Sequence, residues 1–293
     1  MDHRPVSRRR ARSLLVFGSV AATSVLVPAV AHAQLGRATT PDIGEAKPQR
    51  GLSLTETSKR YQDATSDLPS VTTPLTGDLG DGESNRTRYG ASINPSIPVN
   101  LTEDVRMISR AQLPLTSAPV GAGGRETGLG DTHIAVLFGP NRDRTVNYAI
   151  GPSMILPTAT SSELGSQKWS AGPAVAIAAK QGPWVYGGVT SFNWSLAGAE
   201  RRRDVSLLTL QPFAYYNFND GWAVGTSPTA TANFAEKASN MFTIPIGGGI
   251  YKVIRPDPSV PLSLSVQAYA NPIRPDNGPD AQVKFVVAGL FPQ

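Results

Sequence analysis

The chain has 293 residues, of which 27 are Lys or Arg and 22 are Asp or Glu, and it contains no cysteine. The lack of cysteine excludes disulfides, thiolate nucleophiles and thiolate metal sites. The length fits a single all-β domain, and no basic run with interleaved aromatic residues indicates nucleic acid as a partner.

The first 33 residues have the three parts of a secretory signal peptide. Met1–Arg12 carries five arginines, Leu14–Val30 is apolar and uncharged, and Ala31–Ala33 offers small residues before a cleavage site. We therefore expect residues 1–33 to be removed on export, with a retained membrane anchor as the alternative. Removal takes five basic residues and one acidic residue, so the mature chain is expected to be close to neutral.

Residues 34–67 form a lead segment that is poor in aromatic residues and rich in polar ones. We expect at most one short helix there, over Thr55–Ala64. The lead segment either lies in the mouth of the following domain or is a disordered tail. After Ala33 no apolar stretch approaches the roughly 18 residues that a spanning helix needs, so a membrane role requires a β-barrel or peripheral attachment.

From about Leu68 to the C-terminus, short segments alternate in polarity from one residue to the next. Between Leu262 and Asn271, for example, Leu, Val and Ala fall on one face and Ser, Gln, Tyr and Asn on the other. Period two is the pattern of a β-strand whose two faces meet different surroundings. Eleven candidate strands follow this pattern: 87–99, 105–116, 131–139, 145–156, 171–180, 184–195, 204–217, 222–233, 241–253, 261–271 and 280–291.

The connections between these strands alternate between short turns such as Asn100–Asp104 and longer polar joints such as Ser117–Gly130. Outer-membrane barrels have short turns at the periplasmic end and longer loops outside. Parity requires one more strand at the start, and Leu68–Asp78 is the only candidate, although two prolines weaken it. The sequence therefore predicts an all-β transmembrane antiparallel up-and-down β-barrel of about twelve strands over residues 68–293.

Three features favour a barrel in a membrane over a soluble periplasmic β-domain, which is the alternative. The polar face is rich in Ser, Thr, Asn, Gly and Ala, and the strand lengths match the roughly 9–11 tilted residues that span a bilayer core. Aromatic residues gather near strand ends, as at the headgroup level of a membrane. These are Trp169, Trp184, Trp194, Trp222, Phe218, Phe234, Phe242 and Phe291. Prolines inside several strands oppose this interpretation, and we expect them to mark bulges.

Side chains that could carry chemistry are few. Without residues 1–33, His133 is the only histidine, so we expect no metal, no cofactor and no catalytic residue. A Ser–His dyad of the kind that an outer-membrane lipid hydrolase needs would have to use His133, whose parity points into the lumen. Gly247–Gly249 lies inside a strand and predicts a bend or a close approach of strands rather than a phosphate loop.

The polar face of the predicted strands is the candidate pore lining. A charge on the lipid face near the membrane midplane costs roughly 2–4 kcal/mol, which favours placing Arg106 and Arg110 inside. The candidates are Arg106, Arg110, Gln112, His133, Gln267, Tyr269, Gln282 and Lys284. For each charge, a solvated wall position without selectivity is the alternative to contact with cargo.

Several motifs follow one another along the barrel region. They are Leu129-Gly130-Asp131, Gly151-Pro152, Leu156-Pro157-Thr158-Ala159, Lys168-Trp169, Gly172-Pro173, Gly182-Pro183-Trp184, Leu210-Gln211-Pro212-Phe213, Ile244-Pro245, Gly247-Gly248-Gly249, Gln267-Ala268-Tyr269, Pro275-Asp276-Asn277-Gly278-Pro279 and Leu290-Phe291-Pro292. In this combination, together with Tyr89–Leu115, the chain resembles the bacterial outer-membrane transporter family linked to meta-pathway phenol degradation, whose members are often mislabelled neuromedin U. The resemblance implies an outer-membrane barrel that passes small aromatic or hydrophobic compounds, and it implies no catalytic residues. The chain departs from the family pattern at its end, which reads Leu-Phe-Pro-Gln where members of the family usually finish with Lys. We expect Phe291 to serve in place of the final aromatic residue of many outer-membrane proteins.

We therefore expect a channel of the bacterial outer membrane for passive passage of small aromatic or hydrophobic compounds, without enzyme activity. Its expected partners are outer-membrane lipid, the barrel insertion machinery and an unidentified small-molecule cargo. Two alternatives stay open: a structural or adhesive barrel with a filled lumen, and an outer-membrane lipid hydrolase.

Overall fold

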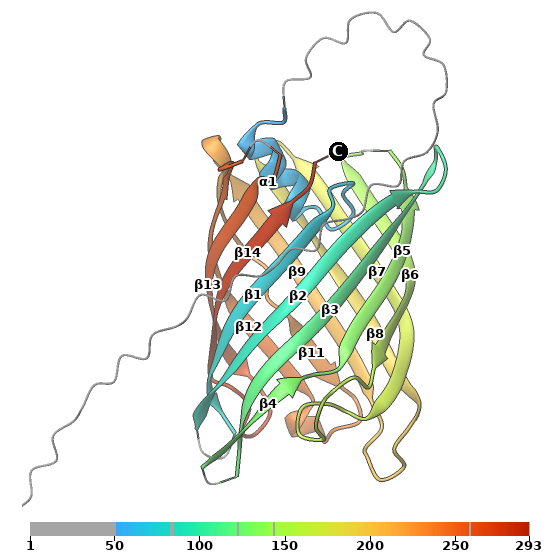
Figure 1. Cartoon of the computed structure of the whole chain (residues 1–293), viewed down its shortest axis with the longest axis vertical. Coiled ribbons are helices and arrows are strands. Elements are labelled where there is room, and N and C mark those ends of the chain that lie inside the picture. The colour runs from blue at the N-terminus through green and yellow to red at the C-terminus, as the bar shows by residue number, and fades with distance from the viewer. Residues whose placement is uncertain (1–50, 83–84, 122, 143, 258, 293) are drawn as a thin grey trace, which may run out of the picture. The chain divides into compact units, whose positions relative to one another are not determined.

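The computed structural model describes residues 51–293 without 83–84, 122, 143, 258 and 293. These residues form one antiparallel sheet that closes into a barrel, and one α-helix (Figure 1). The predicted signal peptide, 1–33, and the first part of the lead segment, 34–50, lie outside the described residues. The elements are α1 Leu54–Gln62, β1 Ser70–Asp81, β2 Arg86–Asn100, β3 Val105–Val120, β4 Gly124–Leu129, β5 Thr132–Pro140, β6 Val146–Leu156, β7 Lys168–Gln181, β8 Trp184–Gly198, β9 Ser206–Asn217, η1 Asn219–Gly221, β10 Trp222–Thr226, β11 Ala230–Asn233, η2 Ala238–Asn240, β12 Phe242–Ile254, β13 Leu262–Ile273 and β14 Ala281–Leu290.

The strand segments make twelve barrel strands, as the sequence predicted. Segments β4 and β5 both pair with β3, and β10 and β11 both lie between β9 and β12. The barrel closes between its first and last strands, where Ser70 lies opposite Leu290 and Leu79 opposite Ala281. Strand β1 also pairs with β2, so the weakest predicted strand, Leu68–Asp78, is formed as Ser70–Asp81.

The two ends of the barrel differ in their connections. At one end, which we call the short-turn end, turns join β2 to β3, β5 to β6, β7 to β8, β9 to β10 and β12 to β13. At the opposite, long-loop end, the connection from β6 to β7 is the longest, and the one from β11 to β12 is slightly longer than any at the short-turn end. The connections from β8 to β9 and from β13 to β14 are as long as the one from β12 to β13, and β1 joins β2 by a short turn at this end. The predicted alternation of short and long joints is therefore present only in part, with one clear exception among the predicted loops.

That exception is Ser117–Gly130, which was predicted as a loop and is instead a hairpin of β3 and β4. Ser117 lies opposite Thr127, and the pairing continues to Val120 opposite Gly124. The prediction was wrong because Pro and Gly residues normally interrupt a strand. Beyond Ser117, however, β3 pairs only with β4, and a strand with one partner tolerates a missing N–H.

The predicted strand 222–233 is interrupted and forms β10 and β11. Pro228 lies in the gap and cannot donate to the ladder. On the adjacent strand β12, a Cβ at Gly248 would meet the carbonyl oxygen of Gly225 at 2.6 Å, so the glycine run allows a close approach of strands, as predicted. Of the predicted proline bulges, Pro245 coincides with a register shift between β12 and β13.

The outer surface of the barrel is apolar and the inner surface polar. On β13, Val266 is 56% exposed while its neighbours Gln267 and Ser265 are buried. All eight predicted girdle aromatics are exposed. Trp184, Phe218 and Trp222 lie at the short-turn end, and Trp169, Trp194 and Phe234 at the long-loop end. Two aromatic belts around an apolar wall are typical of a barrel that spans a bilayer.

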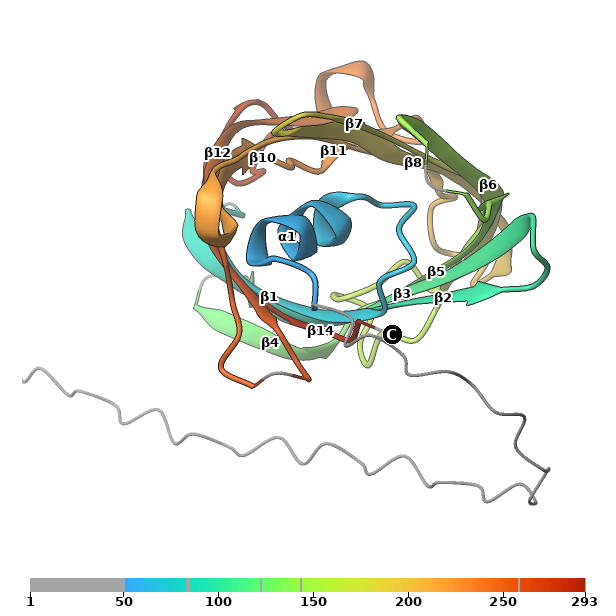
Figure 2. The ribbon, with the colours of Figure 1, turned by 90° about the horizontal axis from the view of Figure 1, so that it is seen from above.

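Helix α1 begins at Leu54 and lies inside the ring of strands, as Figure 2 shows. Ser53 caps it, since its Oγ accepts a hydrogen bond from the backbone N–H of Glu56 at 3.1 Å. The helix ends at Gln62, close to the predicted span Thr55–Ala64, with Asp63 as its C-cap. No helix of the described residues is long and apolar enough to cross a membrane.

Candidate functional site

The candidate site is the lumen of the barrel, which holds a cavity of about 700 Å³. Inward side chains of the strands line this lumen cavity from the lead segment to Pro279 at the long-loop end. Most of the lining is polar and uncharged, because the polar face of each strand points inward. The strand residues include Thr72, Ser92, Asn94, Ser153, Ser191, Asn193, Thr209, Gln211 and Ser265.

Six of the eight predicted lining residues line the lumen cavity: Arg110, Gln112, His133, Gln267, Gln282 and Lys284. Tyr269 is buried in the wall, where its hydroxyl accepts from the N–H of Ser227 at 3.0 Å and donates to Gln267 at 2.9 Å. Arg106 lies nearer the short-turn end. Its guanidinium donates to the carbonyl of Thr65 at 3.3 Å and to Asn141 at 2.8 Å, so it holds the lead segment.

The lead segment fills the lumen at the short-turn end, where Asn217 at the end of β9 is the main buried polar contact of α1. The amides of Asn217 and Gln62 exchange hydrogen bonds of 2.7 and 3.1 Å. Ser58 donates to the same Asn217 oxygen at 3.0 Å. Buried amides that satisfy each other fix one position of a helix, because any displacement leaves donors and acceptors unpaired.

A buried ion pair holds the C-terminal end of α1. The Asp63 carboxylate, 1% exposed, lies 3.3 Å from the Lys180 ammonium of β7. The other carboxylate oxygen accepts from the N–H and hydroxyl of Thr65 at 2.8 and 2.6 Å. The Asp63–Lys180 ion pair and the hydrogen bonds from Thr65 to Asp63 together fix the direction in which the chain leaves the helix toward β1.

The N-terminal end of α1 lies on the turn between β9 and β10. Thr55 donates to the carbonyl of Phe218 and accepts from the N–H of Gly221, both at 3.1 Å. Gly221 has φ +75, and a Cβ there would lie 2.9 Å from the Cβ of Leu54. Glycine is therefore needed at this position for two reasons, its backbone conformation and the closeness of the helix.

Apolar packing also holds the lead segment in the barrel; we call the groups that contact α1 and the residues after it the seat of α1. Leu54 and Tyr61 pack against a buried cluster that includes Val253 and Leu290. Ala64 packs against two further clusters, whose strand residues include several small side chains. These are Ala149, Ala174, Ala176, Ala178 and Ala223. Small inward residues leave room inside the barrel, and the lead segment occupies it.

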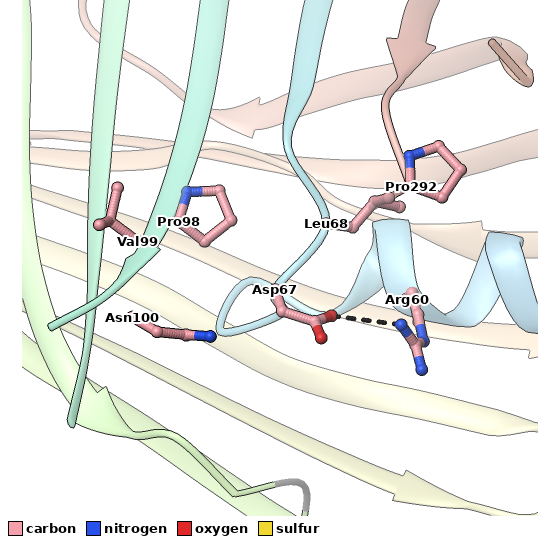
Figure 3. Close-up of a pocket in the computed structure, with 7 residues that line it drawn as sticks. All are labelled: Arg60, Asp67, Leu68, Pro98, Val99, Asn100 and Pro292. Carbon is pink, nitrogen blue, oxygen red and sulfur yellow. Dashed lines mark hydrogen bonds and ion pairs between the residues drawn. The ribbon is translucent and has the colours of Figure 1, made fainter. Parts of the chain in front are cut away.

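A second cavity of about 300 Å³ lies at the short-turn end and is shown in Figure 3. Its lining is Arg60, Asp67, Leu68, Pro98, Val99, Asn100 and Pro292. Arg60 and Leu68 line both this mouth cavity and the lumen cavity, so the chain around them separates the two. Arg60 pairs with Asp67 at 3.5 Å, and Asp67 also lies 3.9 Å from Arg106.

Sequence reasoning missed the residues that seat α1, above all Gln62, Asp63, Lys180 and Asn217. Alternation does place Asn217 on the inward face at the end of a strand, beside the buried Tyr215. A polar residue at an inward strand end is the only signal the sequence offers. Nothing in the local pattern pairs it with a helix more than 150 residues earlier, as the contact to Gln62 requires.

No protein-family model and no curated protein matches the chain. Among solved structures it is similar to the COG4313 outer membrane channel from Pseudomonas putida F1, with TM-score 0.58 and 12% identity over 84% of this chain and 100% of that chain. Weaker likenesses include the NanC porin, with TM-score 0.45 and 11% identity over 77% and 100% of the two chains. Another is the outer membrane phospholipase A of Escherichia coli, with TM-score 0.39 and 10% identity over 78% and 97%.

Likenesses at these identities show a shared fold, and the two weaker ones support no further argument. The shared fold is that of outer-membrane barrels, which agrees with the apolar wall and the aromatic belts described above. The chain is an outer-membrane β-barrel, in the location that its sequence predicted.

Proposed function

We propose that the protein is an outer-membrane channel for passive passage of small aromatic or hydrophobic compounds, and that it is not an enzyme. The observation that carries the proposal is the pair of cavities, about 700 and 300 Å³, on the two sides of the chain around Arg60 and Leu68. A barrel whose lumen served packing alone would have no need of a polar-walled cavity of the size of small-molecule sites.

The proposed route runs from the long-loop end through the lumen cavity to the mouth cavity. The barrier between the cavities includes the Arg60–Asp67 pair, whose side chains are 35% and 47% exposed. Exposed ion pairs contribute only about 0–1 kcal/mol, so thermal motion can part them without unseating α1. In this proposal α1 narrows the channel and the Arg60–Asp67 pair opens and closes it.

Planar bilayer recordings test the proposal. We expect steady single-channel conductance from the wild type and a higher conductance from Asp67→Asn, which removes the charge that holds Arg60 across the route. Asp104→Asn is the matched control, since Asp104 pairs with Arg142 at the same end with both side chains well exposed and lines neither cavity. Liposome swelling with phenol and with a sugar of similar size would show whether aromatic solutes are preferred.

A structural or adhesive barrel with a filled lumen is the second candidate, because the polar groups of α1 that face Asn217 are satisfied. A barrel that folds correctly, as judged by heat-modifiable gel mobility, yet conducts nothing with or without residues 51–67 would favour that candidate over a channel. The lipid hydrolase has less support, since within the described residues no serine hydroxyl is hydrogen-bonded to His133.

A further inference from the structure

Among the described residues, Arg110 on β3 is a lumen cation without a hydrogen-bond or ion-pair partner. Its side chain lines the lumen cavity, and its buried Nη1 has no hydrogen-bond partner among the described residues. The residues opposite it on the neighbouring strands are Ser96 and Ala135, neither of which is acidic. No described carboxylate forms a salt bridge with it.

Three other basic residues of the lumen are paired with carboxylates. Arg88 pairs with Asp81 at 2.8 Å, Lys180 with Asp63 at 3.3 Å, and Arg60 with Asp67 at 3.5 Å. The charged residues that line the lumen cavity, leaving histidine aside, are four basic and two acidic: Arg60, Arg88, Arg110, Lys284, Asp63 and Asp78. Asp63 is bound by Lys180, and Asp78 lies within electrostatic reach of Lys284. The excess of positive charge in the cavity is therefore concentrated at Arg110.

Packing does not explain a guanidinium at this position. An unpaired charge away from bulk water costs free energy, and a neutral residue of similar volume would cost less. The unfilled hydrogen-bond donor of Arg110 therefore indicates a ligand as the missing acceptor. A guanidinium binds carboxylates with two parallel hydrogen bonds, which suits a planar organic anion.

Aromatic side chains contribute to the lining of the same cavity. Tyr61 of α1 and Tyr215 of β9 lie within electrostatic reach of its guanidinium, and both line the lumen cavity. The ring of Tyr215 stacks on Phe213 at 5.9 Å between centroids and meets Tyr251 edge-on at 5.0 Å. Such a surface gives an apolar group a contact area beside the charge.

We propose that Arg110 is the anion-binding group of a lumen site for a small organic carboxylate, whose apolar part lies against Tyr61, Phe213 and Tyr215. Lys284, whose ammonium lies 5.1 Å from the centre of the Tyr269 ring, attracts the anion on its way from the long-loop end. This site would define small organic carboxylates as the substrate class of the proposed channel, and its role in transport rests on that proposed function. Its binding can nevertheless be measured in a barrel that does not conduct.

Isothermal titration of the purified, detergent-solubilised protein tests the site with benzoate and with benzamide, its neutral counterpart. We expect saturable binding of benzoate, about tenfold weaker binding of benzamide, and about tenfold weaker binding of benzoate to Arg110→Gln. Arg203→Gln is the matched control, because Arg203 pairs with Glu236 outside the cavity and is 79% exposed. Acetate should bind more weakly than benzoate, since it lacks the ring.

Heat-modifiable gel mobility establishes that each variant is folded. We expect Arg110→Gln to unfold at the same or a higher temperature than the wild type, because it removes an uncompensated charge; a structural role predicts the opposite. The comparison of benzoate with benzamide needs no variant, so it decides the question even if Arg110→Gln does not fold. Absence of saturable benzoate binding, or equal affinities for benzoate and benzamide, would overturn the proposal.

Discussion

The two halves of the lumen are lined by the same strands but differ in how their polar groups are satisfied. In the short-turn half, α1 and the residues after it are held by the Asn217 amide pair, the Asp63–Lys180 ion pair and apolar packing. In the long-loop half, polar side chains face a cavity, and Arg110, where this cavity meets α1, has a buried Nη1 without a partner among the described residues. A satisfied polar network fixes a structure, whereas unsatisfied groups around a cavity are available to a ligand. One half of the interior is therefore packed around α1, and the other keeps the space that the proposed channel requires.

The largest effect is expected from Lys180→Met, which leaves the buried Asp63 without its cation. Removing one member of a buried ion pair costs about 3–5 kcal/mol. We expect a large drop in the unfolding temperature in detergent, followed by circular dichroism. Lys168→Met is the control, because its partner Asp204 is 80% exposed, and it should cost less than about 1 kcal/mol. Equal losses for the two variants would mean that the short-turn half is no more rigid than the surface.

Asn217→Ala should release α1. It removes the Asn217 amide from both Gln62 and Ser58, which keep only the hydrogen bond between them, at a cost of about 1–3 kcal/mol. We expect limited proteolysis within Leu54–Gln62 to become faster. Asn193→Ala removes a buried amide that Ser153 contacts at 2.8 Å on the lumen side of other strands. It should destabilise the barrel without exposing the helix to protease; cleavage of both variants at one rate would contradict the division into halves.

Gly221→Ala tests the seat of α1 more finely. An alanine with φ +75 costs about 1 kcal/mol, and its Cβ would also press on Leu54 of α1 and on the carbonyl oxygen of Val253 of β12. Gly182→Ala has the same kind of backbone, with φ +56, but its Cβ would meet nothing within 4 Å. We expect the unfolding temperature to fall further for Gly221→Ala. If the two variants fall equally, the contact of the turn with α1 contributes nothing.

The smallest effect concerns the loop between β8 and β9, outside both halves. The hydrogen bond and charge of Lys168 lower the pKa of the Asp204 carboxyl below its ordinary value. The associated stabilisation is complete above the ordinary aspartate pKa and is lost as the pH falls through the lowered one. A carboxylate titration followed by NMR should show this, and Lys168→Met should return the pKa toward the ordinary value. An unchanged pKa in that variant would rule out Lys168 as the cause.

The strands were predictable from the sequence because each one separates lipid from lumen. The predicted strand 261–271 corresponds to Leu262–Ile273, since strict alternation marks both of its faces. Strand β1 was the weakest prediction because its outward positions include Thr73 and Gly77 as well as Leu75 and Leu79. Its identity followed from counting, as a barrel needs an even number of strands to return to the short-turn end.

The interior of the barrel was less predictable than its wall. Alternation indicated that Arg110 and His133 face inward, and both line the lumen cavity. It could not indicate that Arg106 is engaged by Thr65 while Arg110 has no partner. That difference depends on where the lead segment lies, and contacts such as Gln62 with Asn217 join residues that no local pattern connects.

The seat of α1 also has a consequence for the order of folding. Helix α1 precedes every strand in the chain, yet the groups that hold it belong to β7, the turn after β9 and the last strands. The first strand, in turn, closes on the last one. Contacts between distant parts of a chain form slowly, because closing the long loop between them costs conformational entropy before the contacts can stabilise it. The contacts that hold the helix can therefore form only once these distant strands are in place.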